Sequence, residues 1–150
     1  MGINYLILKD SGSRPSIIFS GQVAIPWLSG AAYSAEYYAP TLELIVQQQT
    51  GSKNIVGISG GLFWDGFSRA ADLVYNLNDT YQFTPKWSAT VELFGYLGHN
   101  RPLNYADAGL SYTINKRVQF GCLAGFGLSS AAYTNYFAFN GTGGINTRRR

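Results

Sequence analysis

Hydrophobic and polar residues alternate at every second position along most of this chain. From Ile17, for example, residues of one parity are apolar or Gly as far as Ile25, while Ser20 and Gln22 fall on the other parity. Successive side chains of a β-strand point to opposite faces, so this period predicts strands. It predicts them over residues 17–25, 41–47, 55–64, 71–83, 87–96, 106–113 and 118–127, with Asp79 as an exception. Segments 3–9 and 135–145 are also expected to be strands, although their facing stays open, which makes nine.

The connections between these strands alternate between short and long. Short turns rich in Gly, Ser, Asn, Asp, Pro and Lys are expected at residues 10–14, 51–54, 84–86 and 114–117. Longer links are expected at residues 28–40, 65–70, 98–104 and 129–134. This order predicts an antiparallel up-and-down sheet with turns at one end and loops at the other, an asymmetry typical of outer-membrane barrels.

Two surroundings could explain the two faces of such a sheet. In a soluble sandwich the apolar face meets a second sheet and the polar face meets water, whereas in a membrane barrel the apolar face meets lipid and the polar face lines the lumen. A soluble sandwich would place Lys and Glu on its outer face, but here each Lys sits at or beside a short turn: Lys9, Lys53, Lys86 and Lys116. Aromatic residues lie near strand ends, as membrane interfaces require: Trp27, Trp64, Trp87, Tyr105 and Tyr112. We therefore predict an all-β fold, an antiparallel up-and-down transmembrane β-barrel.

Two alternatives stay open. One is a soluble β-sandwich that binds carbohydrate-like ligands by stacking sugars on Trp27, Trp64 or Trp87. The other is a structural barrel with a plugged lumen. A barrel should need detergent to stay in solution, and a soluble sandwich should not. A channel should conduct in planar bilayers, and a plugged barrel should not.

Composition narrows the classes of function. The 150 residues are only 13% charged but 15% aromatic, which argues against a disordered chain. The net charge of +3 comes from Arg148–Arg150, and without this tail the basic and acidic residues balance, so no nucleic-acid partner is expected. Cys122 is the single cysteine, which excludes an intramolecular disulfide and a multi-cysteine metal site. We expect one domain over residues 1–147, a basic tail at 148–150, and no cofactor or metal.

The strand count predicts that part of a barrel precedes Met1. Bacterial single-chain barrels have an even number of strands, so nine visible strands suggest an N-terminally incomplete barrel of 10 to 12 strands. Residues 1–10 lack the features of a signal peptide, and no apolar stretch is long enough for a spanning helix.

Four stretches resemble a known family. They are Arg14-Pro15-Ser16 leading through Gly21 to Ile25-Pro26; Tyr81–Trp87 followed by Val91-Glu92-Leu93-Phe94-Gly95; Asp107–Tyr112; and Gln119 with Ala124–Leu128. They are similar to the MetA-pathway of phenol degradation family of outer-membrane transporters. The chain departs from that family at Gly121, where an acidic residue is common, and at its end, which lacks the family's aromatic terminal residue.

The resemblance implies a location and partners. The chain would lie in the outer membrane of a Gram-negative bacterium, in contact with outer-membrane lipid, and would meet the outer-membrane assembly machinery during insertion. Small molecules, hydrophobic or aromatic ones among them, would be its cargo, and the transport would be passive.

The residues on the polar face give the candidate site. Four carboxylates share the polar parity: Glu43, Asp72, Glu92 and Asp107. Inside a barrel they could form a polar track that selects what passes, together with Arg69 or Arg101 from the loops and with loop 28–40 as a gate. Alternatively they pair with other lumen groups and hold the barrel's shape.

Catalysis is not expected. A paired-carboxylate hydrolase would need a shielded pocket, which the sequence does not indicate. The single histidine, His99, could act with Ser88 or Ser129, but no nucleophile motif accompanies it. The strand glycines lack the lysine and helix of a phosphate loop, and we expect them to relieve crowding where a large aromatic side chain packs across. Cys122 is expected to face lipid.

Overall fold

The computed structural model describes residues 1–12, 14–26, 35–98, 102–115, 118–132 and 135–143. These residues form nine strands: β1 (Gly2–Leu8), β2 (Ser16–Ala24), β3 (Ala39–Thr50), β4 (Asn54–Phe63), β5 (Asp72–Gln82), β6 (Trp87–Leu97), β7 (Leu103–Asn115), β8 (Val118–Gly127) and β9 (Asn135–Gly143). Each strand pairs antiparallel with the next in one sheet. The predicted all-β class, the nine strands and the up-and-down order are confirmed.

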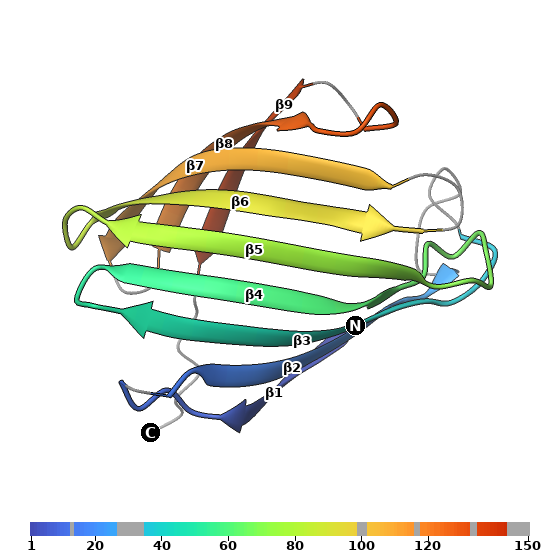
Figure 1. Ribbon diagram of the computed structural model, residues 1–150, viewed down its shortest axis with the longest axis horizontal. Coiled ribbons are helices and arrows are strands. Elements are labelled where there is room, and N and C mark those ends of the chain that lie inside the picture. Colours follow the sequence, from blue (N-terminus) through green and yellow to red (C-terminus); the bar gives the residue numbers. More distant parts are fainter. Residues whose placement is uncertain (13, 27–34, 99–101, 116–117, 133–134, 144–150) are drawn as a thin grey trace.

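The two ends of the sheet differ as the connection lengths predicted. Figure 1 shows the turns after β3 and β5 at one end and the connection after β4 at the other. Gly51 adopts a φ of +78° in the tight turn between β3 and β4, a conformation open to Gly at no steric cost. The sheet curls, and β8 and β9 bend away from the plane of β4 and β5 (Figure 1). It is not closed, because its order ends at β1 on one side and at β9 on the other.

The two faces of the sheet have opposite chemistry. Leu42, Val91 and Phe120 lie on one face and are 40%, 55% and 53% exposed. Among the described residues no hydrophobic side chain is buried. The nine strands form a single sheet, so the described part of the chain holds no second sheet that could cover this face. We call it the apolar face. The opposite face, here the polar face, carries the half-buried Glu43, Glu92 and Asp107.

Side chains are more crowded on the polar face than on the apolar face. Along β6, Ser88, Thr90 and Glu92 are half-buried, whereas Val91 and Leu97 are exposed. Crowding of one face and opening of the other is what the bending of a sheet produces. The polar face is therefore the inner side of the curl.

Two strands are longer than the alternation predicted. Pro40 was expected in a loop, but it lies in β3 opposite Val23, and its carbonyl accepts a hydrogen bond of 3.0 Å from the Trp64 N–H. A proline can occupy a strand where its missing N–H is not required, so this position tolerates it. Similarly, β7 begins at Leu103 rather than near residue 106, because the Asn104 carbonyl accepts a bond of 2.7 Å from the Leu128 N–H.

Asp79 is the exception on the apolar face. It lies in register between Val56 of β4 and Val91 of β6. Its Oδ1 is buried and has no hydrogen-bond partner within the described ranges.

Within the described ranges no helix is long and apolar enough to cross a membrane.

Candidate functional site on the polar face

One row of residues, here called the polar row, crosses the polar face at the middle of the sheet. Each member lies opposite the next on the neighbouring strand, from β3 to β9: Gln47, Gly57, Asn78, Glu92, Asp107, Gly125 and Tyr136. The strand register thus places Glu92 and Asp107 directly opposite each other. Cβ atoms of such cross-strand partners lie about 4.5–5.5 Å apart, close enough for the two carboxylates to interact.

Neutral side chains hold both carboxylates in place. The Asn76 Nδ2 donates to Glu92 Oε2 at 3.4 Å, and the Asn78 Nδ2 donates to the Asn76 Oδ1 at 2.7 Å. The Tyr136 hydroxyl donates to Asp107 Oδ2 at 2.7 Å. These bonds orient the carboxylates, and no Lys or Arg of the described residues compensates their negative charges.

A glycine makes the Tyr136 bond possible. Tyr136 is on β9 and Asp107 on β7, so the tyrosine must cross β8, and it does so at Gly125. A Cβ at Gly125 would meet the Tyr136 ring and would lie 2.6 Å from the Asp107 Cβ. At this position the prediction that strand glycines make room for a large aromatic side chain is confirmed. Gly57 makes room in the same way for Asn78, whose Oδ1 would lie 2.6 Å from an added Cβ.

Aromatic rings line the polar face beside the carboxylates. The Phe94 and Tyr105 rings stack with centroids 5.2 Å apart and an interplanar angle of 17°. Tyr136 meets Tyr105 edge-on at 6.1 Å. A molecule on this part of the face would therefore touch two carboxylates, two amides and three rings.

The other predicted carboxylates lie on the same face but nearer the long connections. Glu43 is in register with Ser20 and Gly61, and Asp72 pairs with Phe63 at the start of β5. The structure therefore brings Glu92 and Asp107 together and spreads Glu43 and Asp72 along the face.

The predicted cations do not accompany the carboxylates where the structure describes them. Arg69 lies in the connection between β4 and β5, and its guanidinium is 5.4 Å from the centre of the Tyr37 ring. Arg101 lies outside the described residues, as do His99, Trp27, Lys116, Arg148–Arg150 and most of the 28–40 loop. Among the described residues no Lys or Arg forms an ion pair with any of the four carboxylates.

The remaining candidates show no assembled chemistry. The Ser129 Oγ accepts a hydrogen bond of 3.2 Å from the Asn104 N–H, and Ser88 lies opposite Ser111 within the sheet. Cys122 is half-buried on the apolar face, in register with Leu110 and Phe139. Nowhere in the described part of the chain do three or more metal-binding side chains gather.

The sequence pattern missed Tyr136 and the aromatic stack. The alternation around Tyr136 is weak, and only the pairing of β8 with β9 shows that its hydroxyl reaches the polar face. Fold and site together define an antiparallel single-sheet protein with an apolar outer face and an acidic, aromatic inner face. No protein-family model, curated protein or solved structure matches this chain. The resemblance to the phenol-degradation family therefore stays a prediction from four short stretches.

Proposed function

We propose that this chain forms the wall of a transmembrane β-barrel in the outer membrane of a Gram-negative bacterium, through which small molecules diffuse. The exposed apolar face is the observation that carries the proposal. Exposure of such a face to water is unfavourable in free energy, because transfer of apolar surface out of water is favourable. In a bilayer the same face meets acyl chains, and the polar face lines the lumen.

The extent of the apolar face supports contact with lipid. Large exposed hydrophobic side chains occur on this face in six consecutive strands: Leu42, Leu44, Ile58, Leu62, Leu73, Leu77, Val91, Leu93, Leu97, Leu110, Phe120 and Phe126. Soluble monomers rarely expose a continuous apolar surface of such extent, which marks a membrane or protein contact. Aromatic rings border it at the short-turn end, where Trp87 and Tyr112 lie with centroids 4.8 Å apart, as an interfacial girdle requires.

A barrel also needs its edges closed. An open edge would leave backbone N–H and C=O groups unpaired in hydrocarbon, and each such group raises the free energy by roughly several kcal/mol. Because eight antiparallel pairings separate β1 from β9, these edge strands run in the same direction. An entirely antiparallel closure therefore takes an odd number of strands beyond the nine, lying between β9 and β1.

The charge of the polar face indicates what passes. Glu43, Asp72, Glu92 and Asp107 would give the lumen wall a negative potential, which favours cations and neutral molecules over anions. The rings of Phe94, Tyr105 and Tyr136 offer apolar contact to hydrophobic or aromatic cargo, the class that the family resemblance implies. Diffusion along this wall requires no cofactor and no covalent step.

Ion selectivity tests the proposed passage. The protein reconstituted in planar bilayers should conduct and should prefer K⁺ over Cl⁻ in a salt gradient. Combined Glu92→Gln and Asp107→Asn should lower the permeability ratio by up to about fivefold for each of the two charges removed, because a unit charge at about 4 Å is worth roughly 1 kcal/mol in water. The amide replacements keep hydrogen-bond acceptors for Asn76 and Tyr136.

A matched control removes one charge away from the wall. Glu36 is an exposed carboxylate in the connection between β2 and β3, so Glu36→Gln should leave the ratio nearly unchanged. A protein that inserts without conducting would contradict passage and support the plugged barrel. A protein that stays monomeric in buffer without detergent and does not partition into vesicles would contradict the barrel itself.

A further inference from the structure

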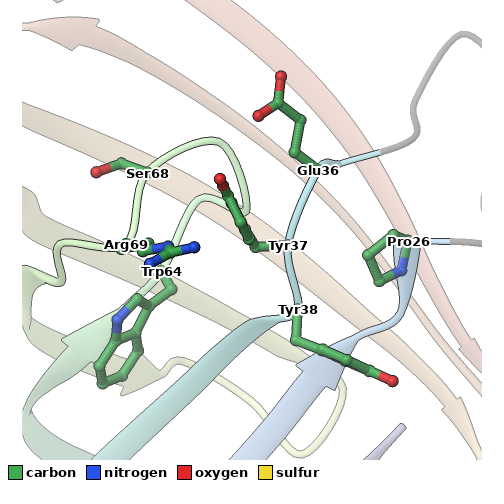
Figure 2. Close-up of a pocket in the computed structure, with 7 residues that line it drawn as sticks. All are labelled: Pro26, Glu36, Tyr37, Tyr38, Trp64, Ser68 and Arg69. Carbon is green, nitrogen blue, oxygen red and sulfur yellow. The ribbon is translucent and has the colours of Figure 1, made fainter.

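A pocket of about 450 Å³ lies at the long-connection end of the sheet, apart from the polar row. Figure 2 shows its lining, which comes from the connection between β2 and β3 and from the connection between β4 and β5: Pro26, Glu36, Tyr37, Tyr38, Trp64, Ser68 and Arg69. Pockets of a few hundred Å³ lined mainly by apolar groups, with a few polar groups, are typical of small-molecule sites.

Backbone hydrogen bonds join the two connections that form the pocket. The Tyr37 N–H donates to the Gly66 carbonyl at 2.9 Å. Gly66 has a φ of +79°, and a Cβ there would lie 3.1 Å from the Tyr37 carbonyl oxygen, so glycine permits this close approach. The Asp65 Oδ1 accepts hydrogen bonds of 2.8 Å from the Phe67 and Ser68 N–H groups. These contacts fix the positions of Tyr37 and Arg69 relative to each other.

Arg69 provides the positive charge in the pocket. Its guanidinium lies 5.4 Å from the centre of the Tyr37 ring. A guanidinium held against an aromatic face keeps N–H donors available at its edge, where they match both oxygens of a carboxylate. Within the described ranges Arg69 forms no ion pair. Glu36 also lines the pocket, but Figure 2 shows its carboxylate directed away from Arg69.

The other lining groups suit a sugar ring. Trp64 and Tyr37 provide aromatic rings beside Arg69, and the electron-rich faces of such rings attract the C–H bonds of a pyranose. Ser68 and Glu36 supply polar groups for ring hydroxyls, and the Ser68 Oγ, which accepts a bond of 3.1 Å from the Ala70 N–H, keeps its own proton to donate. A neutral sugar would leave Arg69 unused, and a purely aromatic acid would leave these polar groups unused.

We propose that this pocket binds an acidic sugar of the hexuronate class. The carboxylate pairs with Arg69, one face of the sugar ring packs on Trp64 next to it (Figure 2), and the hydroxyls meet Ser68 and Glu36. The site depends on the two connections and not on the polar row or on barrel closure. It would therefore persist even if the proposed passage were wrong.

Calorimetric titration of the full-length, detergent-solubilised protein with glucuronate tests this assignment. We expect saturable binding of glucuronate, and at least tenfold weaker binding of glucuronamide, which differs by the loss of the negative charge. Arg69→Gln should weaken glucuronate binding at least tenfold and abolish the preference over glucuronamide. Arg69→Lys should show an intermediate loss, because a lysine keeps the charge but not the paired donors.

Arg14→Gln is the matched control. Arg14 is exposed at the short-turn end of the sheet, so its replacement removes the same charge and should leave the affinity unchanged. Trp64→Leu should weaken the binding of glucuronate and of glucuronamide by a similar factor, since it removes an aromatic ring and leaves the charge of Arg69. Absence of glucuronate binding, equal binding of the two sugars by the unmodified protein, or equal losses in Arg69→Gln and Arg14→Gln would overturn the proposal.

Discussion

Replacing Leu77 by Arg should lower the free energy of unfolding from a lipid bilayer by about 2–4 kcal/mol, the cost of a lipid-facing Arg near the midplane of a barrel. Leu77 is at the centre of β5 on the apolar face and is 46% exposed. If this face met water instead, Arg at an exposed strand position would change stability by no more than about 0.5 kcal/mol. Unfolding in denaturant, followed by tryptophan fluorescence in phospholipid vesicles, measures the difference.

Two further variants separate charge from size and from depth. Leu77→Ala removes apolar area without adding charge and should cost less than Leu77→Arg. Phe83→Arg places the same charge on an exposed position just beyond β5, near the short turn, where the cost should fall to about 0–1 kcal/mol. Equal effects at residues 77 and 83 would show that no hydrocarbon layer covers this face.

Replacing Gly125 by Ala should destabilise the protein by about 1–3 kcal/mol, the usual range for overpacking a filled site. The added Cβ would occupy space taken by the Tyr136 ring and would lie 2.6 Å from the Asp107 Cβ. Moving the ring would also weaken its hydrogen bond of 2.7 Å to Asp107. Denaturant unfolding of the two proteins under identical conditions gives the free-energy difference.

A second glycine and a double substitution identify the cause. Gly60 lies on the apolar face, where an added Cβ would have the Val74 carbonyl oxygen as its nearest neighbour at 3.8 Å, so Gly60→Ala should be neutral or slightly stabilising. In a Tyr136→Ala background the cost of Gly125→Ala should fall, leaving the contact with Asp107. An unchanged cost in that background would mean that the Tyr136 ring is not what Gly125 accommodates.

The sequence pattern predicted the strands well where the two faces differ most in polarity. The alternation at Val91, Glu92 and Leu93 assigned both the strand and its facing, because a period of two has few other physical meanings. The pattern failed at strand ends. Gln48 lies on the apolar parity and Pro40 lacks an N–H, yet backbone pairing with β2 and β4 extends β3 over both.

Strand register set the limit for predicting the site. Parity placed Glu92 and Asp107 on the polar face, but only the pairing of β6 with β7 puts them opposite each other. The contact from Tyr136 over Gly125 to Asp107 joins three strands, so it depends on two registers at once. Arg69 was expected near the carboxylates because of its charge, whereas its connection carries it to the Tyr37 ring.

The edge strands β1 and β9 run in the same direction, and this restricts how copies of this protein can associate. If all copies enter a membrane from the same side, every free edge in that membrane points the same way. Two such molecules could then join along their edges only as parallel neighbours, a pairing that is slightly less stable per residue than the antiparallel one. Uniform orientation would thus disfavour edge-to-edge association of many copies. Each edge strand could still pair with an added strand that runs antiparallel to it.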